Sequence, residues 1–290
     1  MKFRAILNDV TCVQHLSHVL SALVKLSNPW TLKLSPNKFF FILNQRITDG
    51  GMTVWCELIQ TSFFSEYAME GVNHEDANEI LLELQLEQLV NVLKTCLKGC
   101  QSVKLKLTNA HGPCMTVISR NSLSAEVCSE NHVPITVIPR KDWKYFQEPS
   151  SPDIDASIYL PKMTIFKNVV DRMHSLHDKI GIHLQILSAN HNGELEVCVD
   201  ADLVTVKTHF KNLEHPRWSG DSQESQTRNT QQNREFHSVT VDSNKLLLFL
   251  LSEQLSPDKI ACNIKQDMVA HLILLHRDLS IQYLIPACFN

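Results

Sequence analysis

The sequence predicts an α+β protein built from two similar halves, with four helices and largely antiparallel sheets. The chain has 290 residues, of which 43% are hydrophobic and 20% charged, which suits a folded protein of about two domains. Four amphipathic segments recur at even spacing along it, and short strand-like runs fill the sequence between them. Few helices combined with mostly antiparallel strands make an α+β arrangement.

Four segments have the apolar periodicity of a helix. Pro161 stands just before the third, where proline suits a helix start, and Asp242 or Ser243 can cap the fourth. The centres of these helices are about 74, 78 and 79 residues apart, so the chain predicts four copies of one unit. The helices are expected over residues 10–27, 85–98, 162–178 and 243–254.

Each repeated unit is expected to hold one strand, one helix and about three further strands. Asn192-Gly193 favours a type I′ turn between two of the later strands. In the first half the strands are expected at 2–7, 30–34, 39–43, 52–59, 63–69, 79–84, 103–107 and 114–119. In the second half they are expected at 156–160, 182–187, 194–199, 203–210, 237–241, 260–264, 269–275 and 280–285.

Two segments interrupt this pattern and define the domain organisation. Residues 134–155 contain four prolines and are interpreted as a linker between an N-terminal domain, 1–133, and a C-terminal domain, 156–290. Residues 215–235 are rich in Ser, Gln, Asn and Thr, which predicts a mobile loop inside the second domain.

Several function classes find no support in the composition. The chain has eight glycines and none of the glycine-rich phosphate-binding, zinc-protease or serine-hydrolase motifs, so we expect no cofactor and no catalysis. The net charge of −4 excludes a general basic coat for nucleic acid. The longest apolar run, Leu246–Leu251, is far shorter than a membrane span, so no membrane partner is expected. Nine cysteines without a CxxC pair are interpreted as free thiols.

A metal-dependent hydrolase is the alternative from another class. Cys12, His15 and His18 lie three residues apart on the first expected helix, and His174 and His177 repeat that spacing on the third. Such spacing places side chains on one helical face, but no further ligand follows at a recognised zinc spacing. Solvated or packed histidines therefore explain the pattern better.

Basic residues are mildly concentrated on the four expected helices. These segments carry a formal charge of about +4 although the whole chain carries −4. A solvated helix face explains this charge, and so does a shared surface that follows DNA phosphates through nonspecific electrostatics. The candidate DNA-facing residues are Lys25, Lys94, Lys98, Lys167, Arg172 and Lys245.

Local segments along the whole chain resemble the Hus-one family, which supplies one subunit of the heterotrimeric nine-one-one checkpoint clamp. The paralogous Hus-one B form remains an alternative. Helix 10–27 has fewer basic residues than a DNA-facing clamp helix usually has, and the polar segment 215–235 is unusually long. The resemblance is carried by Met1–Ala5, Trp55–Leu58, Met69–Val72, Lys104–Thr108, Val137–Lys141, Ser157–Pro161, Thr208–Leu213 and Ser280–Ala287.

The resemblance implies the DNA-clamp fold, PCNA-like, with two helices of each domain on one face of its sheets. It implies a non-enzymatic subunit of a ring that also contains the Rad-nine and Rad-one subunits. A clamp loader would place this ring around duplex DNA at damage or stalled forks, where it would recruit checkpoint and repair proteins. The expected location is the nucleus, with cytoplasm before assembly. The alternative within this fold is a homotrimeric replicative processivity clamp.

The resemblance also implies where partners bind. Neighbouring clamp subunits pair edge strands, expected here in 114–119 and 203–210, and a partner strand protects an otherwise exposed edge. The corresponding interface residues are Cys114, Met115, Thr116, Val117, Ile118, Val204, Thr205, Val206 and Lys207. Clamps dock partner peptides at the linker, which points to Ile135, Val137, Ile138, Trp143 and Tyr145, although simple packing of the linker onto the sheets also explains these residues.

Overall fold

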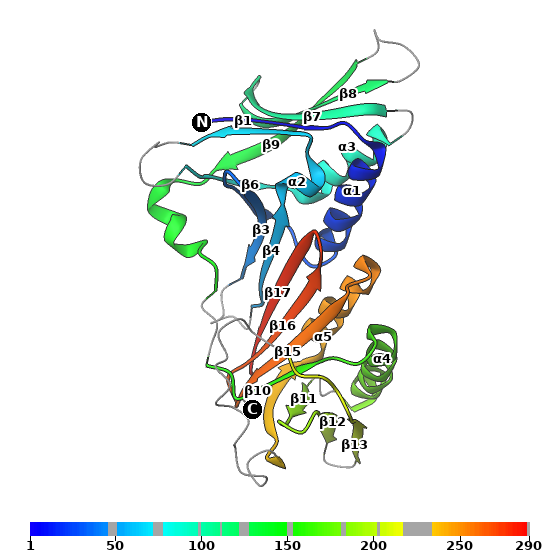
Figure 1. Ribbon diagram of the computed structural model, residues 1–290. Helices are drawn as coiled ribbons and strands as arrows, with labels where there is room; N and C mark the ends of the chain where they lie inside the picture. Colours follow the sequence, from blue (N-terminus) through cyan, green and yellow to red (C-terminus); the bar gives the residue numbers. More distant parts are fainter. Residues whose placement is uncertain are drawn as a thin grey trace. The chain divides into compact units, whose positions relative to one another are not determined.

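The computed structural model describes residues 1–45, 51–71, 78–97, 100–110, 112–121, 128–149, 153–180, 184–201, 204–216 and 234–288. The chain divides into two compact units (Figure 1). Unit 1 contains residues 1–43 and 55–148, and unit 2 contains residues 44–54 and 149–290.

Unit 1 is an antiparallel sheet with two main helices. Along the sheet the strands follow the order β4-β3-β2-β6-β9-β8-β7-β1-β5. The elements are β1 (Lys2–Leu7), α1 (Val10–Val24), β2 (Trp30–Leu34), β3 (Lys38–Asn44), β4 (Thr53–Ile59), α2 (Gln60–Phe63), β5 (Glu66–Glu70), β6 (Ile80–Leu84), α3 (Leu86–Cys96), β7 (Cys100–Asn109), β8 (Pro113–Asn121), β9 (Cys128–Val137) and η2 (Arg140–Tyr145).

Unit 2 repeats this plan with two groups of strands, ordered β10-β15-β16-β17 and β13-β12-β11-β14. Its elements are β10 (Ala156–Tyr159), α4 (Met163–Ile180), β11 (Leu184–Ala189), β12 (Leu195–Ala201), β13 (Val204–Phe210), β14 (His237–Asp242), α5 (Ser243–Leu250), η5 (Leu251–Leu255), β15 (Lys259–Lys265), β16 (Val269–His276) and β17 (Leu279–Pro286).

The pairing of strands shows that each unit is an intertwined pair of repeats. In unit 1 the leading strand β1 pairs with β7 of the second repeat, and the leading strand β6 pairs back with β2 of the first. In unit 2 the equivalent pairs are β10 with β15 and β14 with β11. The expected strand–helix–three-strand unit therefore occurs four times, twice in each unit.

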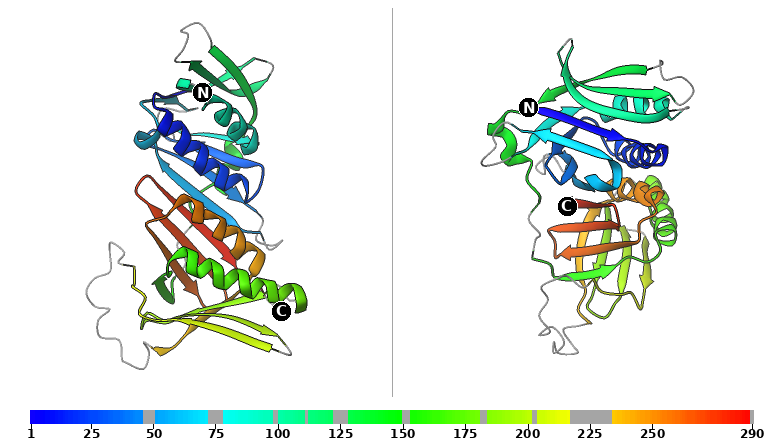
Figure 2. Two further views of the ribbon diagram at one scale, coloured as in Figure 1. Left: turned by 90° about the vertical axis from the view of Figure 1, so that its right-hand side faces the viewer. Right: turned by 45° about the horizontal axis from the view of Figure 1, so that its top comes forward.

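Within each unit, the two main helices lie side by side against one face of the sheet (Figures 1 and 2). The apolar stripe of α1 is buried there, with Leu20 and Leu23 fully inaccessible, and Phe166 of α4 and Phe249 of α5 are equally buried in unit 2. Each such side chain contributes about 1.5–3 kcal/mol of hydrophobic stabilisation. The helical periodicity therefore identified the faces that form the core.

The four main helices occur where the sequence predicts them, and the predicted cap of the fourth is confirmed. The Asn244 amide donates to Asp242 Oδ1 at 2.9 Å, so Asp242 is the N-cap of α5. Asp9 caps α1 in the same way, since the Thr11 amide donates to Asp9 Oδ1 at 2.9 Å. A side-chain oxygen at this position satisfies an amide that has no partner inside the helix.

Two elements of unit 1 differ from the prediction. Residues 128–137 form strand β9, so the connecting segment begins after Val137 and not at residue 134. The strand expected over 63–69 is divided into the one-turn helix α2, which buries Phe63, and the shorter strand β5. The expected loop 215–235 lies mostly outside the described residues.

The described helices contain no segment long and apolar enough to cross a membrane. Seven cysteines have described side chains, and all seven are free thiols, as the sequence predicts.

Candidate DNA-facing and subunit-contact surfaces

The predicted DNA-facing cations lie on all four main helices. Lys94 on α3 and Arg172 on α4 are exposed, Lys25 is the exposed C-cap residue of α1, and Lys245 on α5 is half-exposed. Lys94, Arg172 and Lys245 form no ion pair with any residue that the structure describes. The predicted site residue Lys98 lies outside the described residues.

Lys167 differs from Lys94, Arg172 and Lys245 because a carboxylate neutralises it. Its Nζ lies 2.9 Å from Glu253 Oε2, which joins α4 to η5. The hydrogen bond from Lys167, followed by one from Thr164, lowers the pKa of the Glu253 carboxyl. Lys167 therefore contributes little net charge to the exposed face of α4, although the sequence alone counts it as a free cation.

The outward face of α1 is polar but carries little charge. Its exposed positions are Thr11, Gln14 and His18, with Lys25 at the end of the helix. Such a sparse face would touch phosphates through a few long-range contacts and would read no base sequence. That these helices face DNA stays a prediction.

Strand β8 is not an edge strand, which corrects the interface predicted over residues 114–119. It pairs with β7 from Asn109↔Pro113 to Cys100↔Asn121 and with β9 from Cys114↔Pro134 to Arg120↔Cys128. Both flanks of its backbone are thus occupied inside unit 1. Consequently, none of the five predicted residues of this strand can pair with another chain through the backbone: Cys114, Met115, Thr116, Val117 and Ile118.

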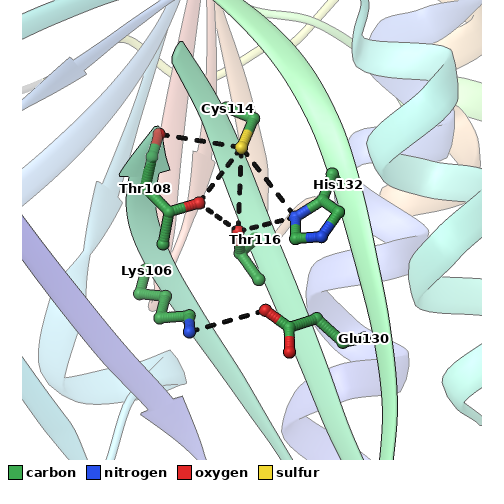
Figure 3. A network of polar contacts seen from close by, with 6 residues as sticks. All are labelled: Lys106, Thr108, Cys114, Thr116, Glu130 and His132. Carbon is green, nitrogen blue, oxygen red and sulfur yellow. Dashed lines mark hydrogen bonds and ion pairs between the residues drawn. The ribbon is translucent and has the colours of Figure 1, made fainter. Parts of the chain in front are cut away.

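Side-chain contacts tie β8 to both of its neighbours as well. Figure 3 shows Thr108, Cys114, Thr116 and His132 pointing toward one another from β7, β8 and β9. Thr116 Oγ1 lies 3.0 Å from His132 Nδ1, and Cys114 Sγ lies 3.1 Å from Thr108 Oγ1. The hydrogen bond with Thr108 is the main cause of the lowered pKa of the Cys114 thiol. This network holds β8 in the middle of the sheet.

The open flank in this part of unit 1 belongs to β9. The strand pairs with β8 up to Pro134 and then with β6 from Ile135 to Val137. Over residues 128–134 the flank turned away from β8 has no strand partner in the described part of the unit. The sequence missed this strand because its exposed positions are polar, including Ser129, Glu130 and His132.

Strand β13 is an edge strand, and it carries the predicted interface residues Val204, Thr205, Val206 and Lys207. It pairs only with β12 among the described strands. Val204 is 42% exposed although it is apolar. Lys207 pairs with Glu196 of β12 at 3.0 Å, so its charge is locally balanced.

The predicted docking residues of the linker occupy three different environments. Ile135 and Val137 belong to β9 and pair with β6, so they are not linker residues. Ile138 is buried, and Trp143 Nε1 donates to its carbonyl oxygen at 3.0 Å, which ties η2 to the residue that directly follows β9. Tyr145 alone is strongly exposed, at 59%.

Phe146, which the sequence reasoning did not single out, joins the connecting segment to the sheet. It packs on the buried cluster of Phe40, Ile42 and Trp55. Phe40 and Trp55 are in ring contact at 5.1 Å, and Lys33 Nζ lies 5.8 Å from the centre of the Phe40 ring. The continuous apolar run in β3 could have predicted such a contact, because a strand that is apolar on both faces must be covered by other residues on both.

The described histidines of the metal-hydrolase alternative do not form a ligand set with one another along their helices. On α1 the ring of His15 packs on Phe63 with centroids 5.0 Å apart, and His18 is exposed. On α4 His174 Nδ1 contacts Ser243 Oγ at 3.1 Å, and the side chain of His177 lies outside the described residues. Among the described residues, Cys12, His15 and His18 do not bring three ligand atoms together.

Sequence comparison identifies relatives over the full length of the chain. The family model for Hus1-like protein matches residues 1–288. Checkpoint protein HUS1 of Homo sapiens is 43% identical, with 99% of each chain covered. Checkpoint protein Hus1-like of Drosophila melanogaster is 27% identical with the same coverage, and Checkpoint protein hus1 of Schizosaccharomyces pombe is 29% identical over 85% of this chain and 84% of that protein.

A solved structure confirms the fold class. Proliferating Cellular Nuclear Antigen from Entamoeba histolytica superimposes with a TM-score of 0.68, at 12% identity and with 99% of each chain covered. This likeness shows the PCNA-like fold that the sequence predicts. The family match over residues 1–288 and the 43% identity to the human protein confirm the resemblance, and they establish that the chain belongs to the Hus1 family.

Proposed function

We propose that this chain is a subunit of the heterotrimeric nine-one-one ring, assembled with one Rad-nine and one Rad-one subunit. The full-length match to checkpoint proteins of the Hus1 family is the observation that carries this proposal. The subunit acts as a non-catalytic scaffold in the DNA-damage checkpoint. It works in the nucleus, and it is present in the cytoplasm before assembly.

Ring contacts would form through backbone pairing at the open flanks of β9 and β13. Main-chain hydrogen bonds provide affinity in such contacts, and the alternating side chains select the partner. Val204 offers an exposed apolar contact beside the β13 backbone. A partner strand would also remove an aggregation-prone edge.

DNA would lie against the helices and be held by topology. Lys94, Arg172 and Lys245, which form no ion pair with described residues, would contact phosphates without reading sequence. A clamp loader would open and close the ring around duplex DNA at damage or stalled forks. Checkpoint and repair proteins would dock near the connecting segment, where Tyr145 is exposed and Phe146 covers the cluster around Trp55.

A homotrimeric processivity clamp is the alternative function for the same fold. The likeness to Proliferating Cellular Nuclear Antigen rests on 12% identity and concerns the fold alone, whereas the full-length relatives are checkpoint proteins. The two functions predict different oligomeric states for the chain purified alone. A stable homotrimer would contradict our proposal.

An assembly experiment tests the proposal through β13. Light scattering after size exclusion should show a monomer for the chain alone and a 1:1:1 complex with Rad-nine and Rad-one. Val204→Asp places a charge where the partner strand should exclude water, so assembly should weaken by at least about tenfold. Met268→Asp is the matched control, because Met268 is a 61% exposed apolar residue of unit 2 outside any strand. Equal assembly of both variants would show that β13 is not an interface.

A further inference from the structure

A basic groove lies on the face of the unit 1 sheet opposite the helices. It is a concavity of about 330 Å³ on β5, β1, β7 and β8. Arg4, Lys104 and Arg120 provide its positive charge, and Glu66 is its carboxylate. Ile6 and Ile118 form apolar parts of the lining. None of these residues lies on the main helices or on the proposed interface strands β9 and β13.

The charge of this groove is not balanced within the protein. Arg4 pairs with Glu66 at 3.0 Å, whereas Lys104 and Arg120 have no ion-pair partner among the described residues. Three cations and one carboxylate leave a net charge of +2 around a small concavity. Elsewhere on the same face, Lys106 pairs with Glu130 at 3.5 Å and Lys2 with Glu70 at 2.9 Å, so the unbalanced charge is specific to the groove.

Strand register explains why Lys104 has no ion-pair partner in the described part of the chain. It stands directly opposite Ile6 of β1 and Ile118 of β8. Directly opposite residues are the natural partners for a cross-strand ion pair, and both of these are apolar. Arg120 stands opposite Ser102, which carries no charge either. The sheet therefore holds two neighbouring cations in place without a counterion among the residues that the structure describes.

We propose that this groove binds the phosphate group of a phosphorylated peptide segment. A phosphorylated side chain carries a charge of about −1.5 to −2 at neutral pH, which complements the net charge of the groove. Arg120 offers a planar guanidinium group that suits phosphate oxygens, and Lys104 adds a point charge beside it, while Arg4 is held by Glu66 in the same groove. The two isoleucines suit the apolar side chains that flank a phosphorylated residue.

The dimensions favour a peptide over duplex DNA. A concavity of about 330 Å³ holds one phosphate group and a few side-chain atoms. Duplex DNA presents a long row of phosphates and is best bound by charges spread along a surface. Here the neighbouring cations Lys2 and Lys106 are already paired with glutamates, so among the described residues no extended row of free charge continues from the groove.

The test measures binding of the full-length chain by fluorescence anisotropy. The probe is a labelled degenerate peptide pool with one central phosphothreonine, compared with the same pool containing unmodified threonine. We expect the phosphorylated pool to bind at least about tenfold more tightly, and we expect added salt to weaken its binding. Lys104→Gln and Arg120→Gln should each reduce the affinity by about five- to tenfold.

Lys106→Gln is the matched control, since Lys106 lies two residues from Lys104 on the same strand and face but outside the groove. It should change the affinity by less than about twofold. Equal binding of the two pools, or an equal loss with Lys106→Gln, would overturn the proposal. A DNA outcome would also overturn it. In that outcome a labelled DNA duplex binds and the phosphopeptide pool does not, and Lys104→Gln and Arg120→Gln each reduce the binding of the duplex. Ring assembly of these variants should stay normal, which separates this test from that of the proposed ring.

Discussion

Lys167 and Arg172 lie on the same helix, but the charges that they present differ. Lys167 contacts Glu253 at 2.9 Å, whereas Arg172 is exposed and forms no ion pair within the described part of the chain. The sequence could identify both as helix cations. It could not show that η5 brings a carboxylate to one of them, because that contact joins residues 86 positions apart.

This difference predicts unequal effects on DNA association of the assembled ring. Arg172→Gln should weaken association and reduce its salt dependence, since a free cation that contacts phosphate releases a counterion. Lys167→Gln should do less, because its charge is already balanced. Glu253→Gln should strengthen association by releasing Lys167. Electrophoretic or anisotropy titrations at several salt concentrations measure all three, and an unchanged salt dependence throughout would show that α4 does not face DNA.

The same ion pair has a predictable pH dependence. The pKa of Glu253 is lowered in the folded protein. The ion pair therefore stabilises the fold fully above the ordinary carboxyl pKa of about 4.3, and this stabilisation is lost as the pH falls through the lowered pKa. The wild-type chain should therefore exceed Glu253→Gln in stability by about 0.5–1 kcal/mol at neutral pH. Urea unfolding at several pH values should show this difference disappearing in acid. A difference that persisted there would have another origin.

At the scale of elements, the four main helices could be predicted, whereas only one of the two expected edge strands lies at an edge. A helix has an apolar stripe that repeats within its own sequence, and all four were found within a few residues of their ends. Strand β9 alternates polar residues with few apolar ones, so its sequence resembles a loop. Which strand lies at an edge depends on pairing between distant segments, which explains why β13 was identified and β8 was mistaken for an edge.

The connecting segment provides a test at this scale. Phe146→Ala removes the ring that covers Phe40, Ile42 and Trp55, and unit 1 should lose about 1–2 kcal/mol because Phe146 is only partly buried. Tyr145→Ala is the control, since Tyr145 is 59% exposed and its removal should cost less than about 0.5 kcal/mol. Urea unfolding followed by tryptophan fluorescence measures both. Equal stability of the two variants would mean that Phe146 does not fix the segment to the sheet.

At the scale of the whole molecule, the proposed ring predicts how DNA is retained. A clamp holds DNA by encircling it, so the assembled ring loaded on a nicked circle should stay bound after a salt wash and escape once the circle is cut. Retention measured by gel filtration before and after linearisation tests this. Tight binding to the linear product would show that contacts, and not topology, hold the DNA. A net chain charge of −4 fits topological retention, because weak contacts are enough.

The interleaved repeats also have a consequence during synthesis on the ribosome. Strand β10 pairs with β15 alone among the described strands, and their partners Ala156 and Ile264 are about 100 residues apart. At about 5–20 residues per second, translation takes roughly 5–20 s to cover that distance. The backbone of β10 remains without its strand partner for that time, so the nascent second unit completes its sheet only near the end of translation. Non-local pairing of this kind is slow to form and leaves aggregation-prone strands unpaired, so we expect chaperones to bind the emerging chain.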